Sequence, residues 1–301
     1  MNRLQANICL LCVTLCWSTE VIIFACIPDS VPPFATTCIT SIAGALLLCL
    51  SFLKRIKETI RREGAGLFRK SLLLGVLNCA YNLLYLYGLK YFDVSSGAFT
   101  LSMTAVVLPV ILFTARRKVS LKTWISAALV FAGIILAVGS NAGVGQFIGG
   151  VLIASGCIIR AVFIILLNDY SAYSDPVSLS AVISAIVGVL SAVLWLITDP
   201  KGFGVLPWNT QIIASLVIYS YFIVAFAQTL NIFAQKQSTP ANATIIYSME
   251  IVMSVLWGTV LPASLIDRTE LTPWIICGLV MVVLGNLVVL IPSRQEKTGE
   301  A

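Results

Sequence analysis

Three charged residues lie inside long apolar stretches of the sequence. Arg160 occupies the middle of the apolar run from 150 to 168, Glu20 lies in a second run, and Glu250 lies in a third. A charged side chain near the centre of a bilayer-spanning helix costs about 2.5–3.5 kcal/mol on insertion scales, so such residues usually face a cavity or one another. We therefore expect these three charges to face one internal cavity and the rest of the chain to position them.

Arg160 has two interpretations. In the first, it forms a structural ion pair with Glu20 or Glu250 that locks helices together. In the second, its planar fork of N–H donors holds a carboxylate or phosphate of a ligand. The two are compatible if a carboxylate is the resting partner that the ligand displaces. The carboxylates themselves are candidates to bind a ligand ammonium group or to carry a proton.

Further polar and aromatic residues recur at helical spacing in other apolar runs. They either hydrogen-bond between helices or line a cavity. Trp17, one turn before Glu20, would form an aromatic wall. In the third predicted span, Asn78 and Tyr81 lie at helical spacing from Asn82 and Tyr85 and form one polar stripe with them. The predicted binding site comprises Arg160, Glu20, Glu250, Trp17, Asn82, Tyr85, Gln228 and Asn231.

The composition is that of a membrane protein. Of 301 residues, 59% are hydrophobic and 11% are charged, whereas soluble domains carry about 25% charged residues. The apolar runs are about 18–25 residues long, which is the length a helix needs to cross ~30 Å of hydrocarbon. The first run lacks a small-residue cleavage site, so we expect it to be a retained span.

Several kinds of chemistry are not expected. The chain has no His, and its nine cysteines lie almost entirely inside predicted spans, where they act as small apolar residues. We therefore predict no metal site and no cofactor. No GxxxxGK[ST] or GxSxG motif is present, so neither ATP hydrolysis nor a serine-hydrolase mechanism is expected, and we predict that the protein is not an enzyme.

Apolar runs and the Pro, Gly and Asp residues between them predict ten spans. Their expected limits are about 5–27, 33–53, 71–89, 95–115, 121–139, 147–168, 176–197, 211–234, 239–261 and 273–291.

The positions of Lys and Arg predict the orientation. With the N terminus in the cytoplasm, fifteen of these residues lie inside and three lie outside, namely Lys90, Lys201 and Arg268. The positive-inside rule then predicts a multi-pass protein of the cytoplasmic (inner) membrane with both termini cytoplasmic. The net charge of +6 reflects this topology, and nucleic-acid binding is not expected. The basic stretch 54–70 is either an interfacial helix that touches anionic lipid or a plain topogenic loop, and the loop is favoured.

The two halves of the chain repeat one another. Shifts of 143, 146 and 152 residues bring similar positions into register in a consistent order. They place Trp17 on Arg160, Asn82 on Gln228, Tyr85 on Asn231, and Gly133 on Gly285. These matches predict two five-helix repeats, 1–141 and 142–301. Because five is odd, the second repeat must enter the membrane from the opposite side, which is typical of secondary transporters with a site between the halves.

The fifth and tenth spans are almost purely apolar. Their small residues are Ser126, Gly133, Gly278 and Gly285. Such residues let helix backbones approach closely, so we expect these spans to serve in packing or in contact with a second copy of the chain.

The order of these features resembles the drug/metabolite transporter superfamily, specifically its EamA-type members. The resemblance covers essentially the whole chain. In the first half it rests on CWSTEVIIF, PPFATTCITSIAGALLL, GLKYFDVSSGAF and VSLKTWISAALVFAGIIL; in the second half on GGVLIASGCIIRAVFIILL, AQKQSTPANATIIYSMEIVMSVLWG and TPWIICGLVMVVLGNLVVL. It implies ten spans and movement of small metabolites, often outward, through a central cavity. Arg160 stands where Trp is usual in this family, and Glu20 where an uncharged residue is commoner.

We therefore predict an all-α polytopic membrane protein of ten transmembrane helices in two inverted five-helix repeats. Its expected function is secondary transport, by alternating access, of a small polar metabolite that is anionic or zwitterionic and amino-acid-like, with export favoured. A cationic drug or metabolite exporter of the same superfamily, and a non-transporting membrane scaffold or sensor, are the alternatives. The expected partners are a small-molecule substrate and the lipid bilayer, with proton coupling and a homodimer through the fifth and tenth spans as further candidates.

Overall fold

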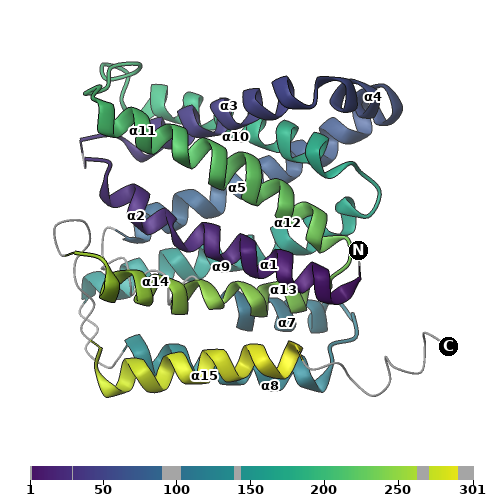
Figure 1. Cartoon of the computed structure of the whole chain (residues 1–301), viewed down its shortest axis with the longest axis vertical. Coiled ribbons are helices and arrows are strands. Elements are labelled where there is room, and N and C mark those ends of the chain that lie inside the picture. The colour runs from purple at the N-terminus through teal and green to yellow at the C-terminus, as the bar shows by residue number, and fades with distance from the viewer. Residues whose placement is uncertain (1, 29, 90–102, 139–143, 263–270, 291–301) are drawn as a thin grey trace.

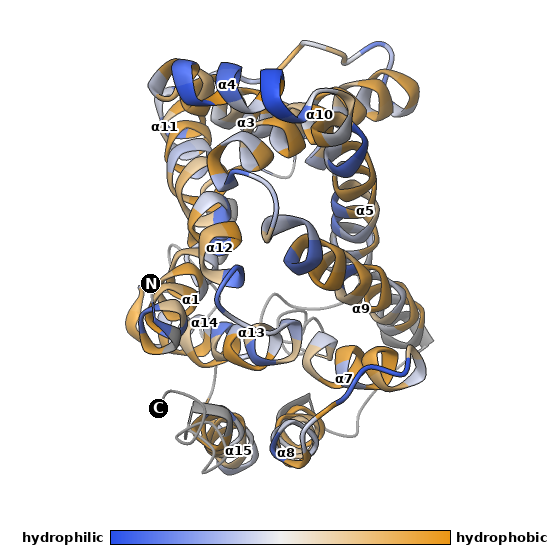
Figure 2. Ribbon diagram, turned by 90° about the vertical axis from the view of Figure 1, so that its right-hand side faces the viewer, coloured by the Kyte–Doolittle hydropathy of each residue, from blue (hydrophilic) through white to orange (hydrophobic). Residues whose placement is uncertain are grey.

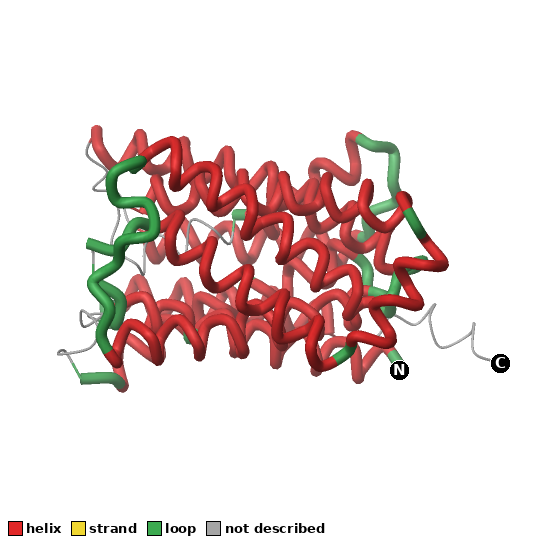
Figure 3. Tube along the Cα trace, turned by 90° about the horizontal axis from the view of Figure 1, so that it is seen from above, coloured by secondary structure: helices red, strands yellow, loops and turns green. Residues whose placement is uncertain are grey.

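The computed structural model describes residues 2–28, 30–89, 103–138, 144–262 and 271–290. Within these ranges every regular element is a helix, and the helices lie roughly along one direction with the loops at the two ends of the bundle (Figures 1 and 3). The N terminus lies at the same end as α4, whereas α2 and α11 lie at the opposite end (Figure 1). The site described below is therefore framed by helices that run from one end to the other.

A helix is present for each of the ten predicted spans. In the first half these are α1 (Arg3–Ser18) with α2 (Glu20–Ala25), α3 (Pro33–Ser51), α5 (Ala65–Leu89), α7 (Thr104–Thr114) and α8 (Leu121–Val138). In the second half they are α9 (Val144–Ser171), α10 (Pro176–Thr198), then α11 (Thr210–Ile218) with η1 (Tyr219–Ala227) and α12 (Gln228–Gln235), then α13 (Pro240–Tyr247) with α14 (Met249–Val260), and α15 (Pro273–Leu290). The first part of the predicted span 95–115 and the boundary predicted between 141 and 142 lie outside the described residues.

Local sequence signals start these helices. Proline opens α3, α10, α13 and α15, and its missing N–H costs nothing at the first helical position. The side chains of Asp175, Asn209 and Thr239 each accept a hydrogen bond from a backbone amide in the first turn of α10, α11 and α13, respectively. These caps satisfy amides that the helix itself leaves unpaired.

Three of the predicted spans contain an interruption or a change of helix type that the sequence analysis did not predict. The first span breaks at Thr19 and the ninth at Ser248, and each hydroxyl donates to a carbonyl in the preceding turn, of Cys16 and Ile245, respectively. Such hydrogen bonds compete with the helical ladder and bend helices. The eighth span contains the π-helix η1, Tyr219–Ala227. Glu20 and Glu250 therefore each lie in the first turn of a second half-helix.

The basic stretch after α3 is also not a plain loop. Residues Leu53–Glu63 form the helix α4, and α5 begins at Ala65, six residues before the predicted start of the third span. Ile56 and Thr59 are the buried residues of α4. Figure 2 shows α4 as a hydrophilic segment at the edge of an otherwise largely hydrophobic bundle.

Helix neighbours follow an approximate two-fold exchange of the two halves. α3 packs along α10, and α8 packs along α15. α5 packs against α9, and in the other half α12 and η1 pack correspondingly against α1. In the same way α7 contacts α9, and α14 contacts α1. This pairing is the one expected when the first span corresponds to the sixth, the second to the seventh, and so on.

The small residues of α8 and α15 face each other within the chain. A Cβ atom added at Gly133 would lie 2.6 Å from the carbonyl oxygen of Gly278, and one added at Gly285 would lie 3.0 Å from that of Ser126. These residues therefore serve in packing between the two helices. A homodimer through the outer faces of α8 and α15 stays a prediction.

This close approach predicts a large effect of a single methyl group. Gly133→Ala would force the α8 and α15 backbones apart, and overpacking of this kind costs about 1–3 kcal/mol. Gly66→Ala is the matched control, because an added Cβ there meets nothing within 4 Å and Ala is favoured over Gly in a helix. Thermal unfolding of the purified variants should show a lower Tm for Gly133→Ala alone; equal Tm values would show that this interface tolerates a wider separation.

Candidate functional site

A cavity of about 130 Å³ lies among the helices that carry the predicted site residues. Seven of the eight predicted residues line it: Trp17, Glu20, Asn82, Tyr85, Arg160, Gln228 and Glu250. Other lining side chains come from α3, α5, α10 and η1, so both halves of the chain contribute. The structure thus brings together residues that are separated by up to 233 positions in the sequence, between Trp17 and Glu250.

Arg160 lies at the centre of this arrangement. It is 9% exposed, and its Nη2 atom is 3.8 Å from Oε2 of Glu250. Its guanidinium carbon is 5.7 Å from the ring centre of Trp17 and 5.9 Å from that of Tyr81, which is within the range of cation–π attraction. Within the described part of the chain the guanidinium makes no hydrogen bond, so its donors are left to whatever occupies the cavity.

Glu20 has a different partner. Its carboxylate accepts a hydrogen bond from the hydroxyl of Tyr219, which lies at the start of η1. Arg160 therefore pairs with Glu250, whereas Glu20 is held by a neutral group. A cavity with two carboxylates and one guanidinium carries one excess negative charge when both carboxylates are ionised.

Amide side chains complete the polar lining. On α5, Asn82 donates to Oδ1 of Asn78 at 2.9 Å, and Asn78 donates to the Tyr81 hydroxyl at 3.2 Å, so this stripe is internally paired. Gln228 on α12 differs, because its Nε2 atom is buried and has no hydrogen-bond partner among the described residues. An unpaired buried donor costs about 1–3 kcal/mol, so Gln228 is a second group that a ligand can satisfy.

Asn231 does not line the cavity, although its helical spacing from Gln228 predicted that it would. Its side chain is 1% exposed and accepts hydrogen bonds from the Tyr247 hydroxyl and from Nε2 of Gln235, the latter at 3.2 Å. The physical reason is depth, since Asn231 lies nearly one turn closer to the N-terminal end of the bundle, where the helices are tightly packed. Asn231 thus belongs to an interhelical network.

Several lining residues were not predicted. Tyr219 is the most important, because it holds Glu20, and the π-helical turn places Tyr219, Ile223, Val224 and Gln228 on the cavity side. Hydrophobic periodicity of an ordinary α-helix gives no signal for a π-helix. The other unpredicted lining residues are the hydroxyl residues Thr36, Thr37, Thr40, Ser41 and Ser184 and the apolar Ile183 and Val187. Small hydroxyl residues are common in membrane helices, so they carried little information.

The cavity extends toward the end of the bundle that carries α2 and α11. Its lining includes Thr36 and Thr37 in the first turns of α3 and Tyr85 in the last turns of α5. The first turns of α3 and the last turns of α5 lie toward the end opposite to the N terminus (Figure 1).

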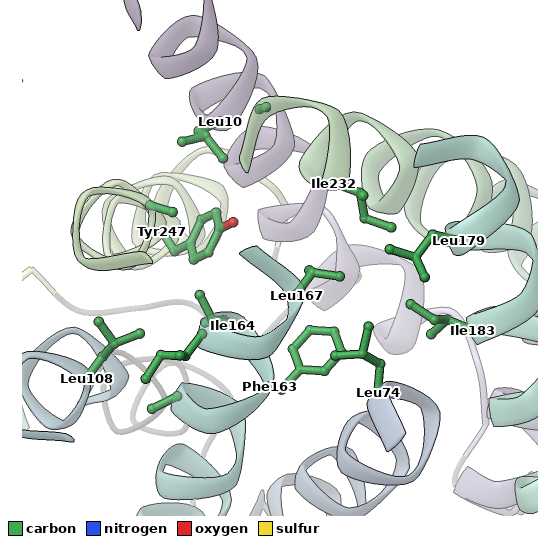
Figure 4. Close-up of a cluster of buried hydrophobic side chains, with 14 of the residues drawn as sticks. Leu10, Leu74, Leu108, Phe163, Ile164, Leu167, Leu179, Ile183, Ile232 and Tyr247 are labelled. Atoms are coloured by element: carbon green, nitrogen blue, oxygen red, sulfur yellow. The ribbon is translucent and has the colours of Figure 1, made fainter. Parts of the chain in front are cut away.

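The N-terminal end is closed by a cluster of buried apolar side chains. Figure 4 shows side chains of α1, α5, α7, α9, α10, α12 and α13 meeting in this cluster. Leu10, Leu74, Leu167, Leu179 and Ile232 are each fully buried in it. Amide groups add to the closure, because Asn168 on α9 donates to the carbonyls of Gln235 and Ser238 at 2.7 and 2.9 Å.

Comparison with known proteins identifies the type of molecule that carries this cavity. The family model described as "EamA-like transporter family" matches residues 4–139. An "Uncharacterized transporter" of Archaeoglobus fulgidus is 26% identical over 290 residues, which cover 96% of this chain and 87% of that protein. The chain matches the EamA-like transporter family in its first half and resembles a protein named as a transporter over nearly its whole length. It is therefore a multi-pass membrane transporter rather than an enzyme, and the fold is the ten-helix inverted repeat of this family.

A solved structure supports this fold independently. A protein described only as "Crystal structure of protein" superimposes with a TM-score of 0.76 at 17% sequence identity, and the match covers 97% of this chain and 99% of the other. At this identity the likeness concerns the fold alone. The similarity nevertheless extends over both halves of the chain, whereas the family model matches only the first.

Proposed function

We propose that this transporter moves a small zwitterionic metabolite, an amino acid or a close relative, through the cavity around Arg160. The observation that carries the proposal is the state of Arg160, whose donors face the cavity without a hydrogen bond from the described residues. A guanidinium that served only to lock helices would be expected to have bidentate partners, since these give an arginine–carboxylate pair its strength. A substrate carboxylate supplies such a partner.

Glu20 favours a substrate that also carries an amine. Arg160 forms its ion pair with Glu250, so the printed hydrogen bond of Glu20 within the described residues comes from the neutral Tyr219 hydroxyl, and an ammonium group would compensate the charge of Glu20. A purely anionic substrate would add negative charge to a cavity that already holds two carboxylates. The same excess charge favours a second candidate, a cationic drug or metabolite, as the cargo of the same cavity.

A matched set of ligands distinguishes these functions. Thermal shift and liposome uptake should be measured with alanine, with ethylamine, which lacks its carboxylate, and with propionate, which lacks its amine; phenylalanine, phenethylamine and phenylpropionate form a larger set. A ligand at 100 times its Kd stabilises the folded protein by about 2.7 kcal/mol, so the zwitterion of at least one set should raise Tm most. Equal shifts with the amines would favour the cationic candidate, and binding without flux would favour a sensor or scaffold.

Transport is expected to proceed by alternating access between the two halves. The closed N-terminal end and the cavity toward the opposite end match one of the two states that such a mechanism needs. Export as the net direction rests on the family resemblance. Proton coupling through Glu20 or Glu250 and facilitated exchange both fit this scheme, and dependence of uptake on a pH gradient would separate them.

We also propose that the protein lies in the cytoplasmic membrane with both termini inside. The positive-inside rule supports this orientation, and it assigns the cavity to the external side of the structure. A membrane-impermeant thiol reagent should label a cysteine introduced at Lys201 in intact cells, whereas one introduced at Lys57 should react only after the cells are opened. All native cysteines must first be replaced, and labelling of position 57 from outside would reverse the orientation.

A further inference from the structure

α4 is amphipathic in a way that the cavity does not explain. Ile56 and Thr59 face the bundle and are buried. Leu53 and Ile60, seven residues apart and on the adjacent face, are 49% and 48% exposed. Since these two lie two helical turns apart, they form an apolar strip that the chain itself leaves uncovered.

A basic strip lies beside the apolar one. Lys54, Lys57 and Arg61 follow each other at spacings of three and four residues, which places them on one face of α4. None of the three makes an ion pair within the residues that the structure describes, in contrast to Arg55 and Arg62. Three cations without protein partners next to exposed apolar side chains form the surface that an interfacial helix presents to a bilayer.

The opposite side of α4 is fixed to the cytoplasmic end of α10. Nη2 of Arg55 is 2.5 Å from Oδ1 of Asp175, and Asp175 caps α10 by accepting a hydrogen bond from the Ser178 amide at 3.0 Å. Burial would raise the pKa of Asp175, but its hydrogen bonds with Ser178 and Arg55 outweigh burial and hold that pKa below its usual range. α10 in turn provides Ser184 to the cavity lining.

A second contact links the same elements. Glu63, at the end of α4, accepts a hydrogen bond from the Ser174 hydroxyl at 2.7 Å and lies 3.6 Å from Nζ of Lys70 on α5. Ser174 directly precedes Asp175 in the connection between α9 and α10. The position of α4 therefore determines the position of the residues that start α10.

We propose that α4 binds anionic phospholipid through Lys54, Lys57 and Arg61, with Leu53 and Ile60 inserted beside the headgroups. The ion pair of Arg55 with Asp175 then couples lipid binding to the start of α10. The occupant is the anionic bilayer surface because cationic and apolar strips lie side by side. Inorganic phosphate offers only the charge, and neutral lipid offers only the apolar part.

The first experiment measures the affinity for lipid. Short-chain phosphatidylglycerol is titrated into the full-length protein in neutral detergent, with short-chain phosphatidylcholine and inorganic phosphate as separate titrations, and Tm is recorded. Each Lys or Arg near an anionic surface contributes about 1 kcal/mol, or about fivefold in affinity. Lys57→Gln with Arg61→Gln should therefore raise the phosphatidylglycerol concentration that gives half the shift by about 30-fold.

A control variant removes two charges from the same side of the membrane. Arg116→Gln with Lys118→Gln alters the exposed connection between α7 and α8 and should leave the titration unchanged. The proposal is overturned if the control shifts the titration as much as the α4 variant does, if the α4 variant behaves like the natural protein, or if phosphate reproduces the effect.

The second experiment tests the link to α10. Phosphatidylglycerol should slow hydrogen exchange in the first turns of α10 in the natural protein. In Arg55→Gln the basic strip is intact, so the rise in Tm should persist, whereas the protection of α10 should no longer respond to lipid. An unchanged response of α10 in Arg55→Gln would show that the anchoring does not pass through this ion pair.

Discussion

Arg160→Gln is expected to lower the affinity for the best zwitterion of the ligand sets by at least ~30-fold. Truncating one partner of a buried, hydrogen-bonded charge pair costs about 2–5 kcal/mol, and the lower limit corresponds to this factor. Arg160→Lys keeps the charge but loses the planar fork, so its affinity should fall by less. Equilibrium binding to the purified variants measures both effects.

Stability separates this role from a structural one. If the pair of Arg160 and Glu250 only locked helices, Arg160→Gln would leave a buried carboxylate unpaired at a cost of about 3–5 kcal/mol, and adding Glu250→Gln should restore both Tm and transport. We expect a smaller loss of stability, because the two groups are 3.8 Å apart and share no hydrogen bond. Full recovery of transport in the neutral double variant would contradict the proposed role of Arg160 as the ligand-binding group.

The sequence was informative about Arg160 because the cost of a charge in hydrocarbon does not depend on structural detail. The shift of 143 residues places Trp17 on Arg160, and in the structure the guanidinium carbon of Arg160 lies 5.7 Å from the centre of the Trp17 ring. Two residues that correspond in the two repeats lie close together when both are near the approximate two-fold axis that relates the repeats. The cost of a charge in hydrocarbon and the repeat of the two halves together predicted that Arg160, Glu20 and Glu250 share one cavity.

Local backbone geometry was not predictable in the same way. The breaks at Thr19 and Ser248 depend on single hydroxyl-to-carbonyl hydrogen bonds, and apolar periodicity is the same on either side of each break. The π-helix that brings Tyr219 to Glu20 is likewise invisible to a search at 3.6 residues per turn. The basic stretch formed α4 because Ile56 and Thr59 are spaced to face the bundle, a signal that its many charges obscured.

The hydrogen bonds of Asn168 distinguish the two ends of the molecule. Its two hydrogen bonds join α9 to the last residue of α12 and to Ser238, in the connection to α13, at the closed end. The shift of 143 places Ala25 at the corresponding position of the first half, and alanine has no side-chain donor. The closed N-terminal end therefore has a link from this position that Ala25 cannot make, whereas the hydrogen bond described near Ala25 at the opposite end runs from Nε2 of Gln211 to the carbonyl of Cys26 at 3.2 Å.

Asn168→Ala should consequently shift the protein toward the state that is open at the N-terminal end. Each lost hydrogen bond contributes about 0.5–1.5 kcal/mol, so two of them should change the ratio of the two states by about 30-fold. Asn286→Ala is the matched control, because Asn286 is also a buried amide with two hydrogen bonds but joins α15 to Ser248.

The measurement is the rate of thiol labelling in a background without native cysteines. Ala234→Cys reports on the closed end, since Ala234 is fully buried in the apolar cluster and the substitution is small. Thr37→Cys reports on the cavity. With Asn168→Ala, labelling at 234 by a reagent on the N-terminal side should accelerate, while labelling at 37 by a reagent on the opposite side slows. Asn286→Ala should lower Tm without changing either rate. Acceleration at both positions would instead indicate general loosening of the bundle, and the asymmetry would then lie in the apolar cluster and not in Asn168.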